Sequence, residues 1–224
     1  MQNQSDQILW REGNVPVSAR FDDPFFSLED GVAETEHVFL SGNDLPARFR
    51  PGFRIAELGF GTGLNLLVAW DAWVKAGIEG PLTFTSFEAF PLSQEDMRRA
   101  HESFPSFDGR RDLLTEAWTD AGGAIDLPGL TAEVIEGDAR ETVPRWAGQA
   151  DAWFLDGFAP ARNPELWSAS LLAEVGRHTA PQGTAATYTA AGFVRRNLSD
   201  AGFVVERVSG YGRKRHMTRA RMER

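Results

Sequence analysis

The sequence predicts an α/β protein with a doubly wound, mostly parallel sheet of seven strands. Short apolar runs typical of buried strands alternate with segments of helical periodicity, and this order produces a parallel sheet covered by helices on both faces. Four of the five strands predicted before a last hairpin end in an acidic residue or a glycine loop. Because ligands of such folds bind beyond the carboxyl ends of the strands, that edge is the expected site.

The first fifty residues are expected to form a β-rich N-terminal cap, and residues 51–224 to form the main domain. Residues 1–50 are aromatic, acidic and rich in turns, with the run Phe21-Asp22-Asp23-Pro24-Phe25-Phe26 and too few apolar side chains for a separate core. Pro51-Gly52 then breaks the chain, and residues 53–58 are apolar enough for a buried strand.

Apolar periodicity defines the remaining elements in order. Residues 64–76 carry apolar side chains at helical spacing, and the helix is expected to end near Gly77. A second strand spans 82–87, and a further helix opens at the cap-like Ser93. After a loop-rich stretch, we expect strands at 131–136, 152–155 and 183–189, helices at 166–178 and 192–201, and a terminal antiparallel hairpin formed by 203–208 and 216–221.

Length and composition fit one globular domain. The 224 residues are 42% hydrophobic and 25% charged, and the absence of cysteine excludes disulfides, thiolate metal sites and cysteine nucleophiles. No apolar run approaches the roughly 20 residues of a membrane span. The N-terminus also lacks the features of a secretory signal, so we expect a cytoplasmic protein with no membrane partner.

Charge is unevenly distributed along the chain. The net charge of −9 argues against a general nucleic-acid binder. Residues 195–224 nevertheless contain nine basic and three acidic residues, net +6, whereas the rest contains 14 basic and 29 acidic residues, net −15. This basic end predicts a local contact with a polyanion, and a solvated cationic tail is the alternative.

A glycine-rich turn follows the predicted strand 53–58. The segment Glu57-Leu58-Gly59-Phe60-Gly61-Thr62-Gly63-Leu64-Asn65 has glycine at every second position, which permits close approach of the backbone to a ligand. Leu64 replaces the third glycine of the dinucleotide fingerprint, and the lysine of a phosphate loop is missing. An acid two places before the first glycine instead favours S-adenosylmethionine, which is cationic and has no pyrophosphate; a tight turn that only packs is the alternative. The cofactor-binding candidates here are Glu57, Gly59, Gly61, Gly63 and Asn65.

Two further strand ends carry acids that suit the same cofactor. Glu88 lies 25 residues beyond Gly63, where an acid can accept both ribose hydroxyls. Asp138 follows the strand 131–136 and would reach the adenine amino group, while Ala139 leaves room for the ring. An ordinary acid near a helix and a solvated turn aspartate are the respective alternatives.

The fourth strand end has the richest chemistry. Asp156-Gly157-Phe158-Ala159-Pro160 follows the apolar strand 152–155. Methyl transfer to nitrogen needs an unprotonated amine whose lone pair is aimed at the methyl group, and Asp156 could accept an amine hydrogen and orient that lone pair. Phe158 offers a ring face to a base or to the sulfonium, and the proline stiffens the loop. The catalytic candidates are therefore Asp156 and Phe158, and Asp156 is also a cofactor-binding candidate. The alternative is a rigid loop without chemical function.

Other signals are weak. The four histidines show no metal-ligand spacing, so no metal site is predicted. No Gly-x-Ser-x-Gly motif is present, which argues against a hydrolase of that type. Trp70 and Trp73 are expected in the core rather than in a base-stacking site.

These residues resemble a known family over nearly the whole chain, from about residue 21 to about residue 217. The family is the MnmC-type tRNA 5-aminomethyl-(2-thio)uridine methyltransferases, which have a Rossmann-like class I methyltransferase fold. The matching segments are 21–23, 34–40 with 42–43, 59–65, 151–160, 163–164 with Trp167, 191–196 and 210–215. The string Asp151-Ala152-Trp153-Phe154-Leu155-Asp156-Gly157-Phe158-Ala159-Pro160 is the most specific of them. His216 and the segment 188–190 depart from the family pattern.

The resemblance implies methylation of the exocyclic amine of 5-aminomethyl-(2-thio)uridine at the tRNA wobble position, with S-adenosyl-L-methionine as donor. It also implies a stand-alone methyltransferase without the oxidase to which this activity is fused in many bacteria. The substrate amine would then come from a separate oxidase or from the enzymes that install the aminomethyl group. The expected partner is the anticodon stem-loop of tRNA, with its phosphates bound by Arg195, Arg196, Arg213, Lys214 and Arg215.

Three other functions remain open from the residues. One is another transferase of the same cofactor fold that acts on a small amine, which would not need the basic end. Another is a catalytically silent tRNA-binding module, against which the acids at the strand ends argue. A nicotinamide oxidoreductase is disfavoured by Leu64.

Overall fold

The computed structural model describes residues 7–11, 14–27, 30–107 and 109–223. Its strands are β1 (Ile8–Arg11), β2 (Val15–Ser18), β3 (Asp23–Pro24), β4 (Arg54–Leu58), β5 (Leu82–Glu88), β6 (Gly123–Leu127), β7 (Leu130–Glu136), β8 (Ala150–Leu155), β9 (Thr179–Thr187), β10 (Phe203–Ser209) and β11 (His216–Met222). Its α-helices are α1 (Gly31–Thr35), α2 (Leu64–Ala76), α3 (Gln94–His101), α4 (Arg110–Ala117), α5 (Ala139–Thr142), α6 (Ala169–Arg177) and α7 (Gly192–Asp200).

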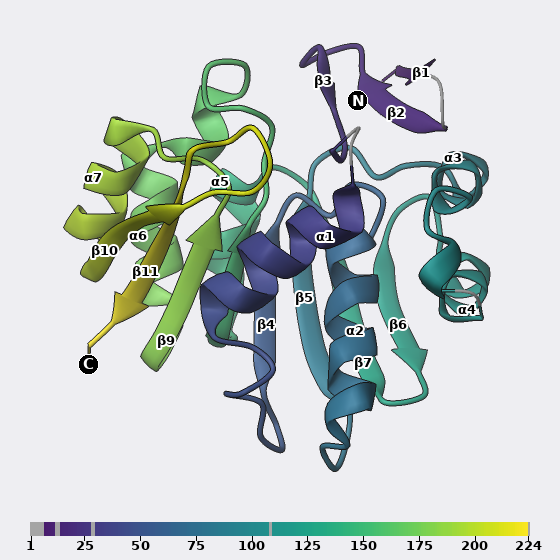
Figure 1. Ribbon diagram of the computed structural model, residues 1–224, viewed down its shortest axis with the longest axis horizontal. Coiled ribbons are helices and arrows are strands. Elements are labelled where there is room, and N and C mark those ends of the chain that lie inside the picture. Colours follow the sequence, from purple (N-terminus) through teal and green to yellow (C-terminus); the bar gives the residue numbers. More distant parts are fainter. Residues whose placement is uncertain (1–6, 12–13, 28–29, 108, 224) are drawn as a thin grey trace.

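One large sheet organises the molecule (Figure 1). Its strand order is β10-β11-β9-β8-β4-β5-β7-β6, in which the five central strands from β9 to β7 run parallel. The terminal hairpin of β10 and β11 adds to β9 with β11 antiparallel to it, and β6 pairs antiparallel with β7 at the other edge. The predicted doubly wound, mostly parallel α/β fold with a C-terminal hairpin is therefore confirmed.

The sheet has eight strands, so the predicted number of seven is wrong. The missed strand, β6, lies in the stretch that was predicted as loop-rich. Gly122 and Gly123 precede its apolar residues and Pro128-Gly129 follows them, so these turn residues mask a strand of only five residues. This strand is stabilised by antiparallel pairing with β7, a contact that the local sequence does not indicate.

Helices cover both faces of this sheet because neighbouring strand residues alternate in direction. Phe154 of β8 packs in the same apolar cluster as residues of α2, α3 and α4. The adjacent Trp153 faces the other side and packs with residues of α5, α6 and α7. The result is a three-layer arrangement, as expected for a buried parallel sheet.

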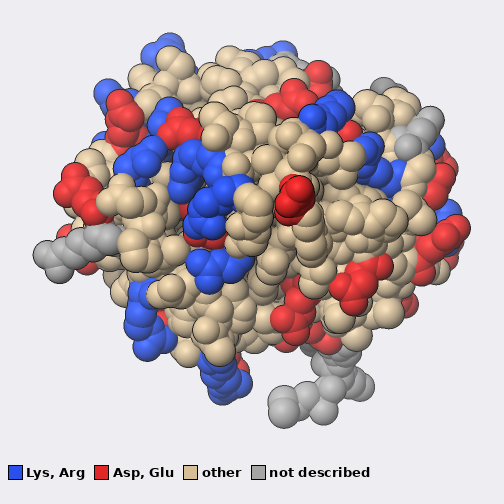
Figure 2. Space-filling model, turned by 90° about the horizontal axis from the view of Figure 1, so that it is seen from below, with Lys and Arg blue, Asp and Glu red and all other residues tan. Residues whose placement is uncertain are grey.

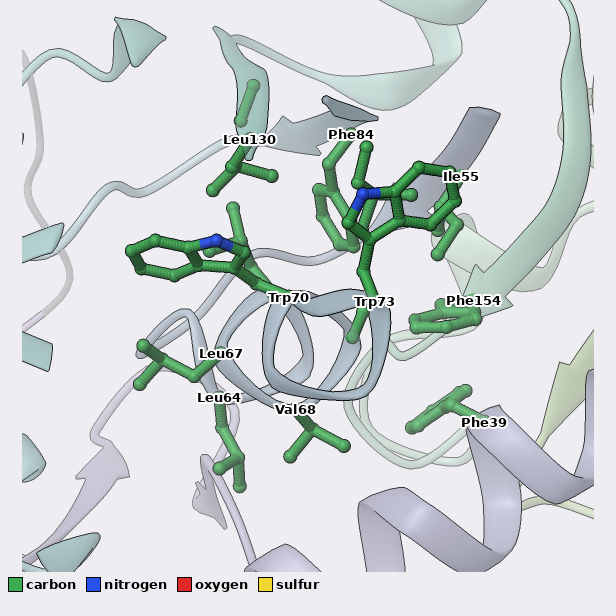
Figure 3. Packing of buried hydrophobic residues seen from close by; sticks show 14 of the residues in the cluster. Phe39, Ile55, Leu64, Leu67, Val68, Trp70, Trp73, Phe84, Leu130 and Phe154 are labelled. Atoms are coloured by element: carbon green, nitrogen blue, oxygen red, sulfur yellow. The ribbon is translucent and has the colours of Figure 1, made fainter. Parts of the chain in front are cut away.

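Helix α2 anchors one of these layers. Figure 3 shows Trp70 and Trp73 on the side of this helix that faces Ile55, Phe84 and Leu130 of the sheet. Both tryptophans are fully buried, which confirms their expected core position. Their indole nitrogens donate to carbonyl oxygens of Pro128 and Gly80, at 2.9 and 3.0 Å, so the polar atoms are satisfied as well.

The N-terminal region combines a small sheet with a helical segment. β1, β2 and β3 form an antiparallel sheet, as the β-rich cap predicts. Residues 31–43, however, run through α1 and then a π-helical and a 3₁₀ turn, which was not predicted. Val38 and Phe39 of this helical segment lie in the same cluster as Phe154, so it packs directly on the main sheet.

Candidate active site

The glycine turn between β4 and α2 adopts a conformation that requires glycine. Gly59, Gly61 and Gly63 have φ angles of 86°, 54° and 73°, in the left-handed region. A Cβ atom at Gly59 would also collide with the carbonyl oxygen of Asp156. Glu88 at the end of β5 accepts a hydrogen bond of 3.0 Å from the Gly61 N–H, which ties the turn to the neighbouring strand. The turn is thus held in one conformation at the carboxyl edge of the sheet.

Asn65, in the first turn of α2, connects two carboxyl groups. Its Nδ2 donates to Oε1 of Glu57 at 2.8 Å and to Oδ2 of Asp156 at 2.7 Å. Its Oδ1 accepts a hydrogen bond of 3.0 Å from the Thr35 hydroxyl of α1. Ser86 donates to the second oxygen of Glu57. With these partners the orientation of the Asn65 amide is fixed, and Asp156 is held against the start of α2.

Burial raises the proton affinity of two acids of this site, Asp156 and Glu57. Burial raises the pKa of Asp156 to about 7, with Asn65 and Lys214 opposing the rise and Glu34 adding to it. Burial also raises the pKa of Glu57 well above its ordinary value, against the hydrogen bonds from Ser86 and Asn65. A carboxyl group with a pKa close to neutrality is suited to exchanging a proton with a bound ligand.

A pocket of about 970 Å³ opens at this edge of the sheet. Its walls include the predicted site residues Gly59, Gly61, Asn65, Glu88, Asp138, Ala139, Asp156, Phe158, Arg213 and Lys214. Glu57 lies behind the wall instead, since its side chain is completely buried and bonded to Asn65. Gly63 also faces inward, where an added Cβ would meet the Phe60 ring at 3.0 Å. The predicted acids Glu88, Asp138 and Asp156 line one cavity together with the glycine turn. Such a cavity fits a nucleoside cofactor with a cationic end.

Asp138 stands at the wall of this pocket but is already paired. It caps α5 by accepting a hydrogen bond from the Arg140 backbone, and the Arg140 guanidinium binds both of its carboxylate oxygens at 2.5 to 3.1 Å. The Arg140 hydrogen bond lowers the pKa of Asp138. Because a carboxylate offers about four lone-pair positions and Arg140 already uses both oxygens, Asp138 would have to release part of this pairing to bind a ligand.

Phe158 packs against the N-terminal region. Its ring stacks on Phe21 with centroids 4.8 Å apart and meets the edge of Phe25 at 5.2 Å. The Asp23 carboxylate accepts a hydrogen bond of 2.8 Å from the Ala159 N–H, and Arg162 is hydrogen-bonded to the carbonyl of Asp22. The segment around β3 therefore forms one wall of the pocket, and part of the surface of Phe158 is already covered.

The predicted basic residues divide into two groups. Lys214 points at the pocket, where its Nζ lies 2.7 Å from Oε1 of Glu34. Arg213 also lines the pocket. Arg196 and Arg215 are exposed outside the pocket wall, and Arg195 is half-buried. Of the remaining basic residues in 195–224, Arg219 and Arg221 pair with Asp44, and Arg224 lies outside the described residues.

Sequence reasoning missed several residues that form or support this site. Glu34, Thr35 and Tyr188 line the pocket, and buried His101 lies 2.8 Å from the Thr62 carbonyl oxygen in the glycine turn. Glu34 and Thr35 belong to a segment that carried the family resemblance, so that signal was present without a role attached. The position of His101 has no local signal, because it depends on how α3 packs beside the turn.

A parallel sheet with a glycine turn and strand-end acids around one pocket is typical of an α/β fold that binds a nucleotide or nucleoside cofactor. Residues 110–223 match the family described as S-adenosyl-L-methionine-dependent methyltransferase. The chain belongs to this family, which confirms the predicted enzyme class and its cofactor, S-adenosyl-L-methionine.

Curated relatives agree with the resemblance read from the sequence. The chain is 44% identical over 230 residues to a Pseudomonas aeruginosa (strain UCBPP-PA14) protein named tRNA 5-methylaminomethyl-2-thiouridine biosynthesis bifunctional protein MnmC, covering 96% of the chain and 34% of the relative. The protein of the same name from Stutzerimonas stutzeri (strain A1501) is 42% identical over 236 residues, covering 98% of the chain and 35% of the relative. The chain thus spans about a third of the length of these relatives.

Solved structures show the same fold. The crystal structure of MNMC2 from Aquifex aeolicus superimposes with a TM-score of 0.74 at 26% identity, covering 100% of the chain and 72% of that structure. TrmN from Thermus thermophilus gives a TM-score of 0.51 at 17% identity, covering 81% of the chain and 47% of that structure, a likeness of fold alone. Among the described residues, no helix is long and apolar enough to span a bilayer.

Proposed function

We propose that this chain methylates the exocyclic amine of 5-aminomethyl-(2-thio)uridine at the tRNA wobble position, giving 5-methylaminomethyl-(2-thio)uridine. The observation that carries the proposal is the carboxyl group of Asp156, held by Asn65 at the wall of the pocket with a pKa of about 7. The names of the relatives supply the substrate, because the product in those names contains a methylated aminomethyl group.

The pocket residues would divide the binding of the cofactor among them. The turn with Gly59 and Gly61 would allow close approach, Glu88 would accept hydrogen bonds from the ribose hydroxyls, and Asp138 with Ala139 would contact the adenine. When bound, S-adenosyl-L-methionine supplies a methyl group on a positively charged sulfur. Glu57 would act indirectly, because it fixes Asn65 rather than touching the ligand.

Asp156 would handle the proton of the substrate amine. An aminomethyl group is mostly an ammonium at neutral pH, and its nitrogen has no free lone pair until one proton leaves. The Asp156 carboxylate accepts that proton at an Oδ atom and then holds a remaining N–H, which keeps the lone pair directed into the pocket. Phe158, stacked on Phe21, closes the side of the pocket and excludes water from the reacting nitrogen.

The test is a reconstituted reaction. Purified protein, S-adenosyl-L-methionine and tRNA that carries 5-aminomethyluridine at the wobble position should yield the methylaminomethyl nucleoside, detected by mass spectrometry after digestion. tRNA with an unmodified wobble uridine is the matched control and should gain no methyl group. Cofactor binding without any methylation of the modified tRNA would contradict the proposal and favour a silent binding module, whereas methylation of small amines alone would favour another transferase.

In cells, we propose that the protein acts in the cytoplasm after another enzyme has produced the amine. That enzyme is a separate oxidase that removes a carboxymethyl group, or the machinery that installs the aminomethyl group directly. Wobble nucleosides from cells with and without the protein should differ only in the last methyl group.

A further inference from the structure

The ammonium of Lys214 lies at the wall of the pocket, beside an acidic and an aromatic side chain. Lys214 belongs to the loop between β10 and β11, and its Nζ lies 2.7 Å from Oε1 of Glu34 on α1. The same Nζ lies 4.2 Å from the centroid of the Tyr188 ring, over its face. A carboxylate and an aromatic face converging on one nitrogen is the arrangement by which proteins bind ammonium groups.

Glu34 is more buried than Lys214, and Tyr188 is held by a hydrogen bond beside Asp156. The Glu34 side chain is only 13% exposed, and the Tyr188 hydroxyl donates a hydrogen bond of 2.7 Å to the Gly157 carbonyl, beside Asp156. The Lys214 side chain is 46% exposed and stands on a surface loop that contains Gly210 and Gly212. The cation therefore belongs to the most exposed of these three side chains.

The position lies next to the proposed proton acceptor. Asp156, Glu34, Tyr188 and Lys214 all line the same pocket. The charges of Lys214 and Glu34 both reach Asp156, since Lys214 lowers and Glu34 raises the pKa of its carboxyl group. An ammonium that replaced the Lys214 Nζ would thus contact Glu34 and the Tyr188 ring and would interact electrostatically with Asp156.

We propose that Glu34, Tyr188 and Asp156 form a subsite for an alkylammonium ligand, which Lys214 occupies while the ligand is absent. The inference rests on the proposed function, since the aminomethyl group of the substrate is such an ammonium. The α-ammonium of the cofactor's methionine part has the same chemistry and is the other source. Exchange of one cation for another keeps Glu34 paired, so the subsite is never left with a buried unpaired charge.

Displacement would give Lys214 a second contact. Once its Nζ leaves Glu34, it can bind a phosphate of the incoming RNA, which is the role expected for this basic cluster. RNA binding and entry of the amine would then support each other, because each favours the withdrawn position of Lys214.

The experiment measures binding rather than turnover. Two anticodon stem-loops, one with 5-aminomethyluridine and one with uridine at the wobble position, are titrated into wild-type protein and into Glu34→Gln and Lys214→Met variants. Wild-type protein should prefer the aminomethyl stem-loop, and Glu34→Gln should reduce this preference by at least about tenfold, the size of one charge-assisted hydrogen bond. Lys214→Met should weaken binding of both stem-loops, because the phosphate contact is lost, and should leave the preference for the aminomethyl stem-loop unchanged or larger.

A purely structural ion pair gives a different result. Glu34→Gln would then change neither the preference between the stem-loops nor the affinity for S-adenosyl-L-methionine, and the inference would be overturned. Titration of each variant with S-adenosyl-L-methionine identifies the source of the ligand, because loss of cofactor affinity in Glu34→Gln with the stem-loop preference intact assigns the subsite to the cofactor's ammonium. Thermal melting shows whether each variant is folded.

The same samples separate this inference from the proposed function. If wild-type protein methylates the aminomethyl stem-loop and Glu34→Gln changes neither preference nor cofactor affinity, only the subsite is wrong. If wild-type protein methylates neither stem-loop, the proposed function fails, and the cofactor titration alone then decides for or against the subsite.

Discussion

Asp156 carries a carboxyl group whose proton affinity is set by its neighbours. Its side chain accepts one hydrogen bond from Asn65 and lies in a pocket wall where burial raises its pKa to about 7. Below that pH the group is mostly protonated and cannot accept a proton from the substrate. Above it, the carboxylate is available.

We therefore expect the methyl-transfer rate at saturating cofactor to rise with pH through about 7 and then to level off, as far as this group is concerned. In Asp156→Asn, this limb should disappear and the rate should fall by about 10²- to 10⁴-fold, while calorimetry should show cofactor binding retained. A fully active Asp156→Asn protein, or an unchanged limb near pH 7, would remove Asp156 from the chemistry.

The sequence predicted the positions of some site residues in the fold better than those of others. Glu88, Asp138 and Asp156 were predicted because each follows a strand of a parallel sheet, and such strand ends share one edge. Glu57 was predicted to touch the cofactor, yet it lies behind Asn65 because it belongs to the buried part of β4. Glu34 meets Lys214 across 180 positions of the sequence, a contact that only the folded chain defines.

At the scale of elements, strong periodicity gave accurate bounds. Helix α2 spans residues 64–76, as predicted, because its apolar spacing is clear and Gly77 ends it in a left-handed conformation. Two elements were missed. The strand β6 is short and bordered by turn residues, and the helical segment 31–43 begins with a short helix that contains acidic residues. Both are stabilised by packing on other elements, which local patterns do not report.

Two glycines allow the turn after β4 to be tested against a matched control. Gly59 and Gly77 both have positive φ, 86° and 65°, but only an added Cβ at Gly59 meets the backbone of Asp156, whereas Gly77 has open space. We expect Gly77→Ala to lower the free energy of unfolding by about 1 kcal/mol with cofactor binding intact. Gly59→Ala should cost at least about 3 kcal/mol, because the backbone must shift as well, and cofactor affinity should fall.

Urea unfolding and calorimetry measure the two quantities for each variant. Equal losses of stability in the two variants would show that the contact with Asp156 adds nothing to the conformational effect. Full cofactor affinity in a folded Gly59→Ala protein would show that the turn need not approach the ligand closely.

At the scale of the whole molecule, positive charge is placed on two faces. Arg213 and Lys214 line the pocket at the carboxyl edge of the sheet. Figure 2 shows the face seen from below, where most Lys and Arg side chains lie in the left half of the view and a smaller group lies toward the upper right. Away from the pocket, Arg219 and Arg221 pair with Asp44, and Arg50 with Asp151, so much of the charge is neutralised by neighbouring acids. The net charge of +6 in residues 195–224 therefore does not form a single surface.

The distribution of basic residues over the surface predicts which arginines affect tRNA binding. Arg196→Ala combined with Arg215→Ala should weaken tRNA binding and reduce the slope of log affinity against log salt by about 2, since each phosphate that the protein no longer neutralises lowers the slope by roughly one unit. Lys75→Ala is the control, because Lys75 is an exposed cation at the far end of α2 in a pair with Asp71. An unaltered salt slope in the double variant would exclude these arginines from the RNA interface.

The strand order β10-β11-β9 places β11 between two strands that precede it in the sequence. β10 reaches the rest of the sheet only through β11, so neither can dock until residues 216–222 have left the ribosome. During translation, β9 consequently carries an unsatisfied edge until β11 has left the ribosome, and a nascent chain stalled before that point would expose this edge to aggregation.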